Sequence, residues 1–138
     1  MNLNQSFTLD ICFSELQIIK FAEVSGDFNP IHFDDKAAEK LGFERKIVHG
    51  FLSSSVFSRI IGMDFPGNGS IYLSQTLKFI KPVYENVVYL AKVEIIDYII
   101  EKKRFVLSTI LIEKESDVTV ITGEAIVYNE KINYYDGF

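Results

Sequence analysis

Residues 50–63 read GFLSSSVFSRIIGM, and this stretch decides how the rest of the chain is interpreted. On a helical wheel its apolar side chains point in nearly every direction, and Arg59 is its one charge. A helix that is apolar on all sides is buried inside its domain. Its remaining surface is a stripe of small residues four apart, formed by Gly50, Ser54 and Ser58. The stretch therefore predicts a buried central helix against which another element packs closely.

After this helix the apolar pattern changes to a period of two. Alternating residues predict strands over residues 70–79, 87–98, 104–113 and 118–128. The connections between the last three strands are short, which favours antiparallel neighbours. Helix and strands are thus segregated along the chain. This order is typical of an α+β fold in which an antiparallel sheet wraps one long central helix.

The chain before the central helix predicts three shorter elements. Alternation over residues 7–13 indicates an opening strand. Ser14 and Gln17 have the spacing of a capping box, which predicts a helix that ends near Gly26. Asp34 or Asp35 can cap a further short helix over residues 36–41. The stretch between these two helices is predicted to be loop, because Pro30 forbids helix at the residue before it.

Composition limits the classes of protein to consider. The chain has 138 residues, 48% of them apolar, which fits a single domain spanning residues 1–138. Its formal charge of −5 has the wrong sign for a nucleic-acid partner. The single cysteine cannot form an internal disulfide, and no Cys/His cluster has zinc-ligand spacing. No basic leader and no apolar run of about 18 residues is visible, so we expect no membrane partner and a cytoplasmic location.

The two histidines of the chain, His32 and His49, fall in the same irregular stretch before the central helix. Asp27 and His32 lie five residues apart in a loop that contains Asn29 and Pro30, so the backbone can aim both side chains at one point. A carboxylate and an imidazole that meet can transfer protons near neutral pH. The alternative is structural: Asp27 forms a turn by binding backbone N–H groups, and His32 is a polar loop residue.

His49 and Gly50 come directly before and at the start of the central helix. The unpaired N–H groups and the positive dipole end there can stabilise negative charge on a ligand oxygen, and Gly50 allows close approach. The alternative is that Gly50 permits tight packing and that His49 lies next to the cap. Ser54 and Ser58 likewise have a packing role available, in which each hydroxyl binds a carbonyl one turn back.

A family resemblance joins these separate signals. The residues that carry it are Phe21, Ala22, Ser25, Gly26, Asp27, Asn29, Pro30 and His32, followed by Ile47, Val48, His49 and Gly50. This pattern resembles the signature of the MaoC-like (R)-specific enoyl-CoA hydratases. The resemblance continues through residues 69–73, through Phe79, Pro82 and Val83, and through residues 122–125, and so covers roughly residues 7–128. It implies the hotdog fold, in which an antiparallel sheet wraps a long helix.

The resemblance also implies roles for particular residues. Asp27 and His32 correspond to the catalytic pair, and the backbone N–H of Gly50 to the group that receives the thioester oxygen. Asn29 corresponds to a residue that shapes the catalytic loop, and Ser58 to a serine near the reaction site. We add His49 and Ser54 as candidate substrate-binding residues. Leucine at position 58, and less so at 54, is expected to impair turnover more than leucine at Ser53, which the wheel places opposite.

The activity expected from the resemblance is the reversible addition of water to trans-2-enoyl-CoA, which gives (R)-3-hydroxyacyl-CoA. Coenzyme A is then part of the substrate, and neither a metal nor any other cofactor is expected. A homodimer or higher homo-oligomer is expected as well. Three other functions stay open: a 3-hydroxyacyl-ACP dehydratase, a hotdog acyl-CoA thioesterase, and a non-catalytic module that binds acyl thioesters. Phe51, where the family often has Met, is expected to alter the acyl pocket.

Overall fold

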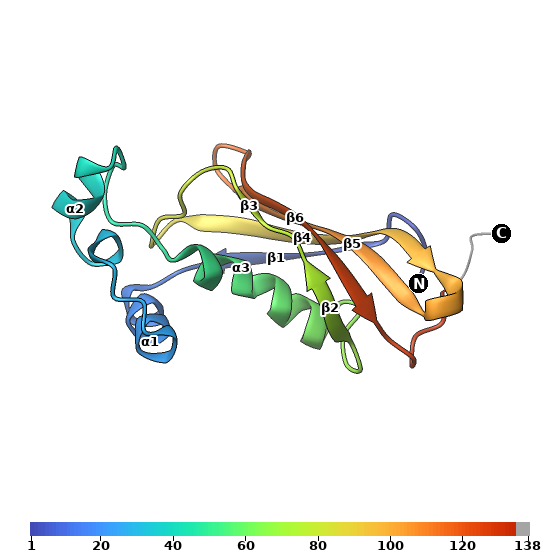
Figure 1. The fold of residues 1–138 in the computed structure, drawn as a ribbon. Helices are drawn as coiled ribbons and strands as arrows, with labels where there is room; N and C mark the ends of the chain where they lie inside the picture. The colour runs from blue at the N-terminus through green and yellow to red at the C-terminus, as the bar shows by residue number, and fades with distance from the viewer. Residues whose placement is uncertain (135–138) are drawn as a thin grey trace.

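The computed structural model describes residues 1–134, which form one antiparallel sheet with helices on one side and at one end (Figure 1). The helices are α1 (Glu15–Ser25), α2 (Asp35–Lys40) and α3 (Gly50–Arg59), with short helical segments η1 (Pro30–His32), η2 (Ile60–Asp64) and η3 (Ile100–Lys102). The strands are β1 (Ser6–Cys12), β2 (Ile71–Gln75), β3 (Lys78–Phe79), β4 (Val88–Ile99), β5 (Arg104–Glu113) and β6 (Val118–Tyr128).

The sheet wraps the central helix, as the sequence predicts. Its strand order is β1-β4-β5-β6-β2, with β3 also paired to β6, and every pairing is antiparallel. Figure 1 shows α3 lying along one face of this sheet, with α1 and α2 gathered at one end. The alternating buried residues of β4 and β5 face the helix side chains Val56, Phe57, Ile60 and Ile61. Burial of each such side chain contributes about 1.5–3 kcal/mol.

Helix α1 begins and ends where its sequence predicts. The hydroxyl of Ser14 accepts from the Gln17 N–H at 3.2 Å, and the Ser14 N–H donates to the Gln17 side chain at 2.9 Å. At the other end Gly26 has φ +79° and donates its N–H to the carbonyl of Ala22 at 2.8 Å. Glycine adopts this left-handed conformation without the Cβ penalty of other residues. The helix therefore ends at Ser25, and Gly26 alone separates it from Asp27.

The strand predicted over residues 70–79 is interrupted, which corrects that prediction. The structure has β2 and β3 with a break at Thr76, whose N–H donates to the carbonyl of Glu124 at 2.9 Å. The break passes directly over Gly123 on β6, where a Cβ would lie 1.9 Å from the carbonyl oxygen of Thr76. Only glycine at position 123 allows this approach. Alternation alone does not reveal such a close crossing.

The central helix has the predicted extent to within one residue but is less buried than predicted. It continues in π-helical geometry to Asp64, and its outer face is open in the single chain: Phe51 is 71% and Met63 77% exposed. Ile71, Tyr72 and Leu73 of the neighbouring edge strand β2 are exposed as well. The apolar residues of this helix thus fall into two sets: one face packs in the core, and the other forms an apolar surface of the single chain. No helix within residues 1–134 is long and apolar enough to cross a membrane.

Candidate active site

The loop between α1 and α2 is built from a series of side-chain to backbone hydrogen bonds. The hydroxyl of Ser25 accepts from the Asp27 N–H at 3.1 Å, Oδ1 of Asp27 from the Asn29 N–H at 3.1 Å, and Oδ1 of Asn29 from the Ile31 N–H at 3.3 Å. Each bond closes a turn over two residues. Asn29 also caps η1, which carries His32 at its last position. These turns bring position 32 back toward position 27.

Asp27 has the geometry of both roles that the sequence left open. Its Oδ1 forms the turn with Asn29, and its Oδ2 lies 3.8 Å from Nε2 of His32. That distance exceeds the range of about 2.7–3.2 Å for a direct hydrogen bond. A water molecule can bind both atoms at once across such a gap. The His32 side chain is 7% exposed and that of Asp27 49%, so the pair combines a buried base with one that solvent reaches.

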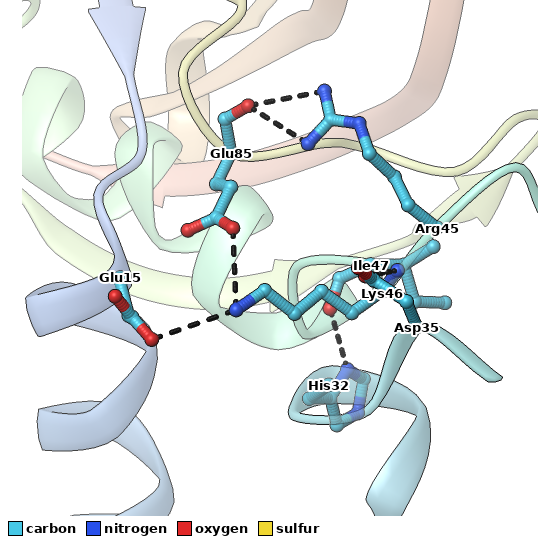
Figure 2. A network of polar contacts seen from close by, with 7 residues as sticks. All are labelled: Glu15, His32, Asp35, Arg45, Lys46, Ile47 and Glu85. Atoms are coloured by element: carbon cyan, nitrogen blue, oxygen red, sulfur yellow. Dashed lines mark hydrogen bonds and ion pairs between the residues drawn. The ribbon is translucent and has the colours of Figure 1, made fainter. Parts of the chain in front are cut away.

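One hydrogen bond fixes which nitrogen of His32 carries the hydrogen. Nδ1 lies 2.8 Å from the carbonyl oxygen of Ile47 (Figure 2). A carbonyl only accepts, so Nδ1 must donate, and in the neutral ring Nε2 keeps a lone pair directed toward Asp27. Burial lowers the pKa of His32 and outweighs the Ile47 hydrogen bond, which raises it; His49 lowers it further and Asp27 raises it. His32 is therefore a neutral acceptor at neutral pH.

His49 contacts both members of the pair and positions them. Its ring stacks on that of His32 with 3.8 Å between centroids and a 28° tilt, and the Phe21 ring packs against the His49 ring with 4.8 Å between centroids. Nε2 of His49 donates to the backbone carbonyl of Asp27 at 2.9 Å. Its Nδ1 is buried and has no hydrogen-bond partner within residues 1–134. The structure thus places His49 where it positions Asp27 and His32, and not among the residues that line the adjoining cavity.

A mostly apolar cavity of about 360 Å³ adjoins His32, which lines it together with Gly50, whereas Asp27 is not among its lining residues. Gly50 is the first residue of α3, so its N–H belongs to the turn that has no partner inside the helix. A Cβ at this position would lie 2.9 Å from Cε1 of Phe79. Gly50 therefore permits close packing, as one interpretation predicts, and also presents an N–H near the cavity, as the other predicts.

The serines of α3 separate into two groups. Ser54 and Ser58 line a second hollow of about 560 Å³ together with Phe51, and Phe79 borders both hollows. Ser54 donates its hydroxyl to the carbonyl of Gly50 at 2.9 Å, which is the expected packing role. Ser53 lies on a different side from Ser54 and Ser58, as the wheel predicts, but it is fully buried and lines the cavity of His32. This position removes the basis for expecting leucine at Ser53 to be the mildest change. The spacing of three residues between Gly50 and Ser53, which puts both on one helix face, could have indicated this position.

Asp27, His32 and His49 could also be considered as metal ligands, since one donor atom from each lies within 4.8 Å of the others. A metal ion binds an imidazole in the plane of the ring, along the nitrogen lone pair. The two rings are stacked 3.8 Å apart, so their planes do not meet at one ion position. In addition, one nitrogen of each ring already binds a carbonyl oxygen. The arrangement suits proton transfer better than metal binding.

A helix wrapped by an antiparallel sheet, with an aspartate and a histidine meeting near the helix N-terminus, fits a hydro-lyase with the hotdog fold. Residues 2–116 match the family described as MaoC like domain, and the chain belongs to this family. The fold and the family that the sequence predicts are thereby confirmed. Both agree with the structure, in which the sheet wraps α3 and Asp27 and His32 lie near the start of that helix.

Two relatives and one solved structure illustrate the similarity. The chain is 39% identical over 127 residues to the (R)-specific enoyl-CoA hydratase of Aeromonas caviae, a match that covers 92% of this chain and 94% of the relative. It is 44% identical over 115 residues to a mitochondrial 3-hydroxyacyl-[acyl-carrier-protein] dehydratase of Arabidopsis thaliana, covering 82% and 68%. The structure of the (R)-hydratase from A. caviae involved in PHA biosynthesis superimposes with a TM-score of 0.88 at 37% identity, covering 94% and 97%.

The lowered pKa of His32 makes a direct prediction for its titration. We expect the midpoint to lie below the ordinary 6.5, as followed by the ring Cε1–H signal in NMR spectra recorded against pH. The chain has one other histidine, so a His32→Gln variant assigns the two signals without ambiguity. A midpoint at or above 6.5 would contradict the buried, neutral His32.

The same shift affects stability, with a sign that can be worked out. Because the folded pKa lies below that of the unfolded chain, the unfolded chain binds more protons between the two values. His32 therefore lowers the free energy of unfolding as the pH falls from about 6.5 toward the folded pKa. Denaturant unfolding in this window should show a smaller pH dependence for His32→Gln than for the unchanged chain.

Proposed function

We propose that the protein catalyses the reversible addition of water to trans-2-enoyl-CoA to give (R)-3-hydroxyacyl-CoA. The observation that supports it most is the 3.8 Å approach of the His32 Nε2 lone pair to Oδ2 of Asp27. Both atoms are acceptors, so one water molecule can donate one hydrogen to each. This is the arrangement that a hydration reaction needs for its nucleophile.

The proposed reaction uses three groups of this chain. Asp27 removes a proton from the water held between it and His32, while the water oxygen bonds to the β-carbon. The pair then returns a proton to the α-carbon, so that hydrogen and hydroxyl add to one face of the double bond. The Gly50 N–H and the N-terminal end of α3 stabilise the negative charge that collects on the thioester oxygen. Such a donor contributes about 3–4 kcal/mol to other acyl-transfer sites.

Coverage favours coenzyme A as the carrier of the acyl group. The match to the A. caviae enoyl-CoA hydratase includes 94% of that protein, against 68% of the Arabidopsis acyl-carrier-protein dehydratase. The higher identity of the second, 44%, makes a 3-hydroxyacyl-ACP dehydratase the second candidate. We propose that no metal or redox cofactor takes part. A cytoplasmic location is proposed because the free, exposed Cys12 suits a reducing compartment.

The test of this function is the loss of conjugated enoyl absorbance when the protein is mixed with crotonyl-CoA. We expect hydration at a rate that EDTA does not change, and faster turnover with the CoA thioester than with the acyl-carrier-protein thioester. Preference for the carrier protein would support the second candidate. Release of free thiol from saturated acyl-CoA would instead indicate a thioesterase, and binding without turnover a non-catalytic module.

Replacement of either member of the pair should abolish most of the activity. Asn at position 27 keeps the oxygen that accepts from the Asn29 N–H, so Asp27→Asn leaves the loop intact while removing the base. We expect Asp27→Asn and His32→Gln each to lower kcat by about 100-fold or more with little change in KM.

The matched control is Asp34→Asn, a nearby aspartate whose carboxylate caps α2 through the Lys36 N–H. It should keep nearly full turnover. A single variant of the pair that retains more than about a third of the original kcat has no proton-transfer role.

We also propose a homodimer, because β2 is an edge strand with an exposed apolar surface. Ile71, Tyr72 and Leu73 are exposed, and so are Phe51 and Met63 on the adjacent helix face. An unprotected apolar edge of this kind pairs with a second copy, which here would extend the sheet across a twofold axis.

Sedimentation velocity should therefore show a dimer, and Leu73→Asp should shift it to the monomer. Leu41→Asp is the control, since Leu41 is also an exposed leucine but lies at the end of α2. A wild-type monomer with full hydratase activity would rule out the dimer as the active unit.

A further inference from the structure

The segment of residues 45–47, two residues short of the start of α3, is anchored at several points that lie far apart in the sequence (Figure 2). The Arg45 guanidinium donates two hydrogen bonds of 3.3 Å to the backbone carbonyl of Glu85. It also lies over the ring of Tyr84, 4.8 Å from the centroid. A planar guanidinium that is both hydrogen-bonded and stacked has little freedom. The first residue of the segment is thus held against the loop before β4.

Lys46 connects the segment to three other parts of the chain. Its ammonium lies 3.4 Å from a carboxylate oxygen of Glu85 and 3.5 Å from one of Glu15 on α1. Its backbone N–H donates to Oδ1 of Asp35 on α2 at 3.0 Å. The Lys46 side chain is 21% exposed and that of Glu85 12%, so this pair is screened much less than a surface pair.

The charge state of Lys46 supports this anchoring role. Burial alone would lower the pKa of Lys46, but the carboxylates of Glu85 and Glu15 outweigh it and raise that pKa above its ordinary value. The side chain therefore stays a cation from neutral pH to about its ordinary value of 10.5, a range in which His32 is neutral. The contacts with both carboxylates are present throughout that range.

Ile47, the next residue, makes the contacts that bind the segment to the candidate site. Its N–H donates to the carbonyl of Ile31 at 3.0 Å, and its carbonyl accepts from Nδ1 of His32 at 2.8 Å. If this carbonyl shifts, His32 is free to take the other tautomer, with the hydrogen on Nε2. Nε2 would then be a donor, so it could no longer accept a hydrogen from a water bound between it and Oδ2 of Asp27, 3.8 Å away.

We propose that Lys46 is a positioning residue for His32. By holding residues 45–47 between α1, α2 and the loop before β4, it keeps the Ile47 carbonyl on Nδ1 and so keeps the Nε2 lone pair directed toward Asp27. The kinetic consequence rests on the proposed hydratase function, whereas the tautomer of His32 can be measured without any turnover. Lys46 itself does not line the cavity beside the pair.

The test compares Lys46→Met with Lys46→Arg and with the control Lys40→Met, all in the full-length protein. Lys40 is a lysine of α2 whose ammonium makes no ion pair or hydrogen bond within the described part of the chain. Lys46→Met should lower kcat on crotonyl-CoA by about 10-fold or more with KM within about twofold, because misplacement of a reacting group affects kcat above all. ¹⁵N-resolved NMR should show that His32 has lost its single Nδ1–H tautomer. Lys46→Arg should restore both properties.

Glu85→Gln is the second variant, because it removes the charge that faces Lys46 and keeps the backbone carbonyl that binds Arg45. Glu85→Gln should cause the same change in the His32 tautomer to a smaller degree. It replaces Lys46→Met in the comparison if that variant does not fold. The proposal is overturned if Lys46→Met has the same His32 tautomer and the same kcat as the control Lys40→Met. If Lys46→Met does not fold, the same comparison is made with Glu85→Gln. A changed tautomer in a protein that hydrates no enoyl thioester would overturn the proposed function and leave the positioning role standing.

Discussion

The hydrogen bond from Nδ1 of His32 to the carbonyl oxygen of Ile47 is the constraint on which the rest of the site depends. It joins a loop after α1 to the segment before α3, and it leaves exactly one ring nitrogen with a lone pair. Both partners are largely shielded from solvent, where a hydrogen bond is stronger than in water and an unmade one is costly. Because the ring is neutral and oriented, its Nε2 and the Asp27 carboxylate form two acceptors aimed at one point.

The surrounding structure supports this bond from two sides. On one side His49 stacks on the His32 ring and donates to the Asp27 carbonyl, so a single buried side chain fixes both members of the pair. On the other side the ion pairs of Lys46 fix the segment that carries the Ile47 carbonyl. The cavity beside His32 then opens next to Gly50 at the start of α3. A thioester oxygen that binds there would bring its double bond toward the pair, which is why hydration is the reaction we propose.

Local signals in the sequence predicted those parts of the fold that depend on local chemistry. The capping box at Ser14, the left-handed Gly26 and the turn residues of the loop each act over a few neighbours, so α1 and the approach of Asp27 to His32 were predictable. The break at Thr76 was not, because it results from contact with Gly123 on another strand. The place of His49 behind the pair was not predictable either, because it depends on which end and face of α3 meet the loop. A helical wheel does not contain that information.

The central claim is that Asp27 and His32 act as one unit on a single water molecule. The most direct measurement is the kcat of the double variant Asp27→Asn/His32→Gln on crotonyl-CoA, compared with the two single variants. If both groups hold one water, neither works without the other, and the double variant should be scarcely slower than the slower single variant. If the two residues act independently, their losses multiply, and a double variant slower than both by the product of the single effects would contradict the account.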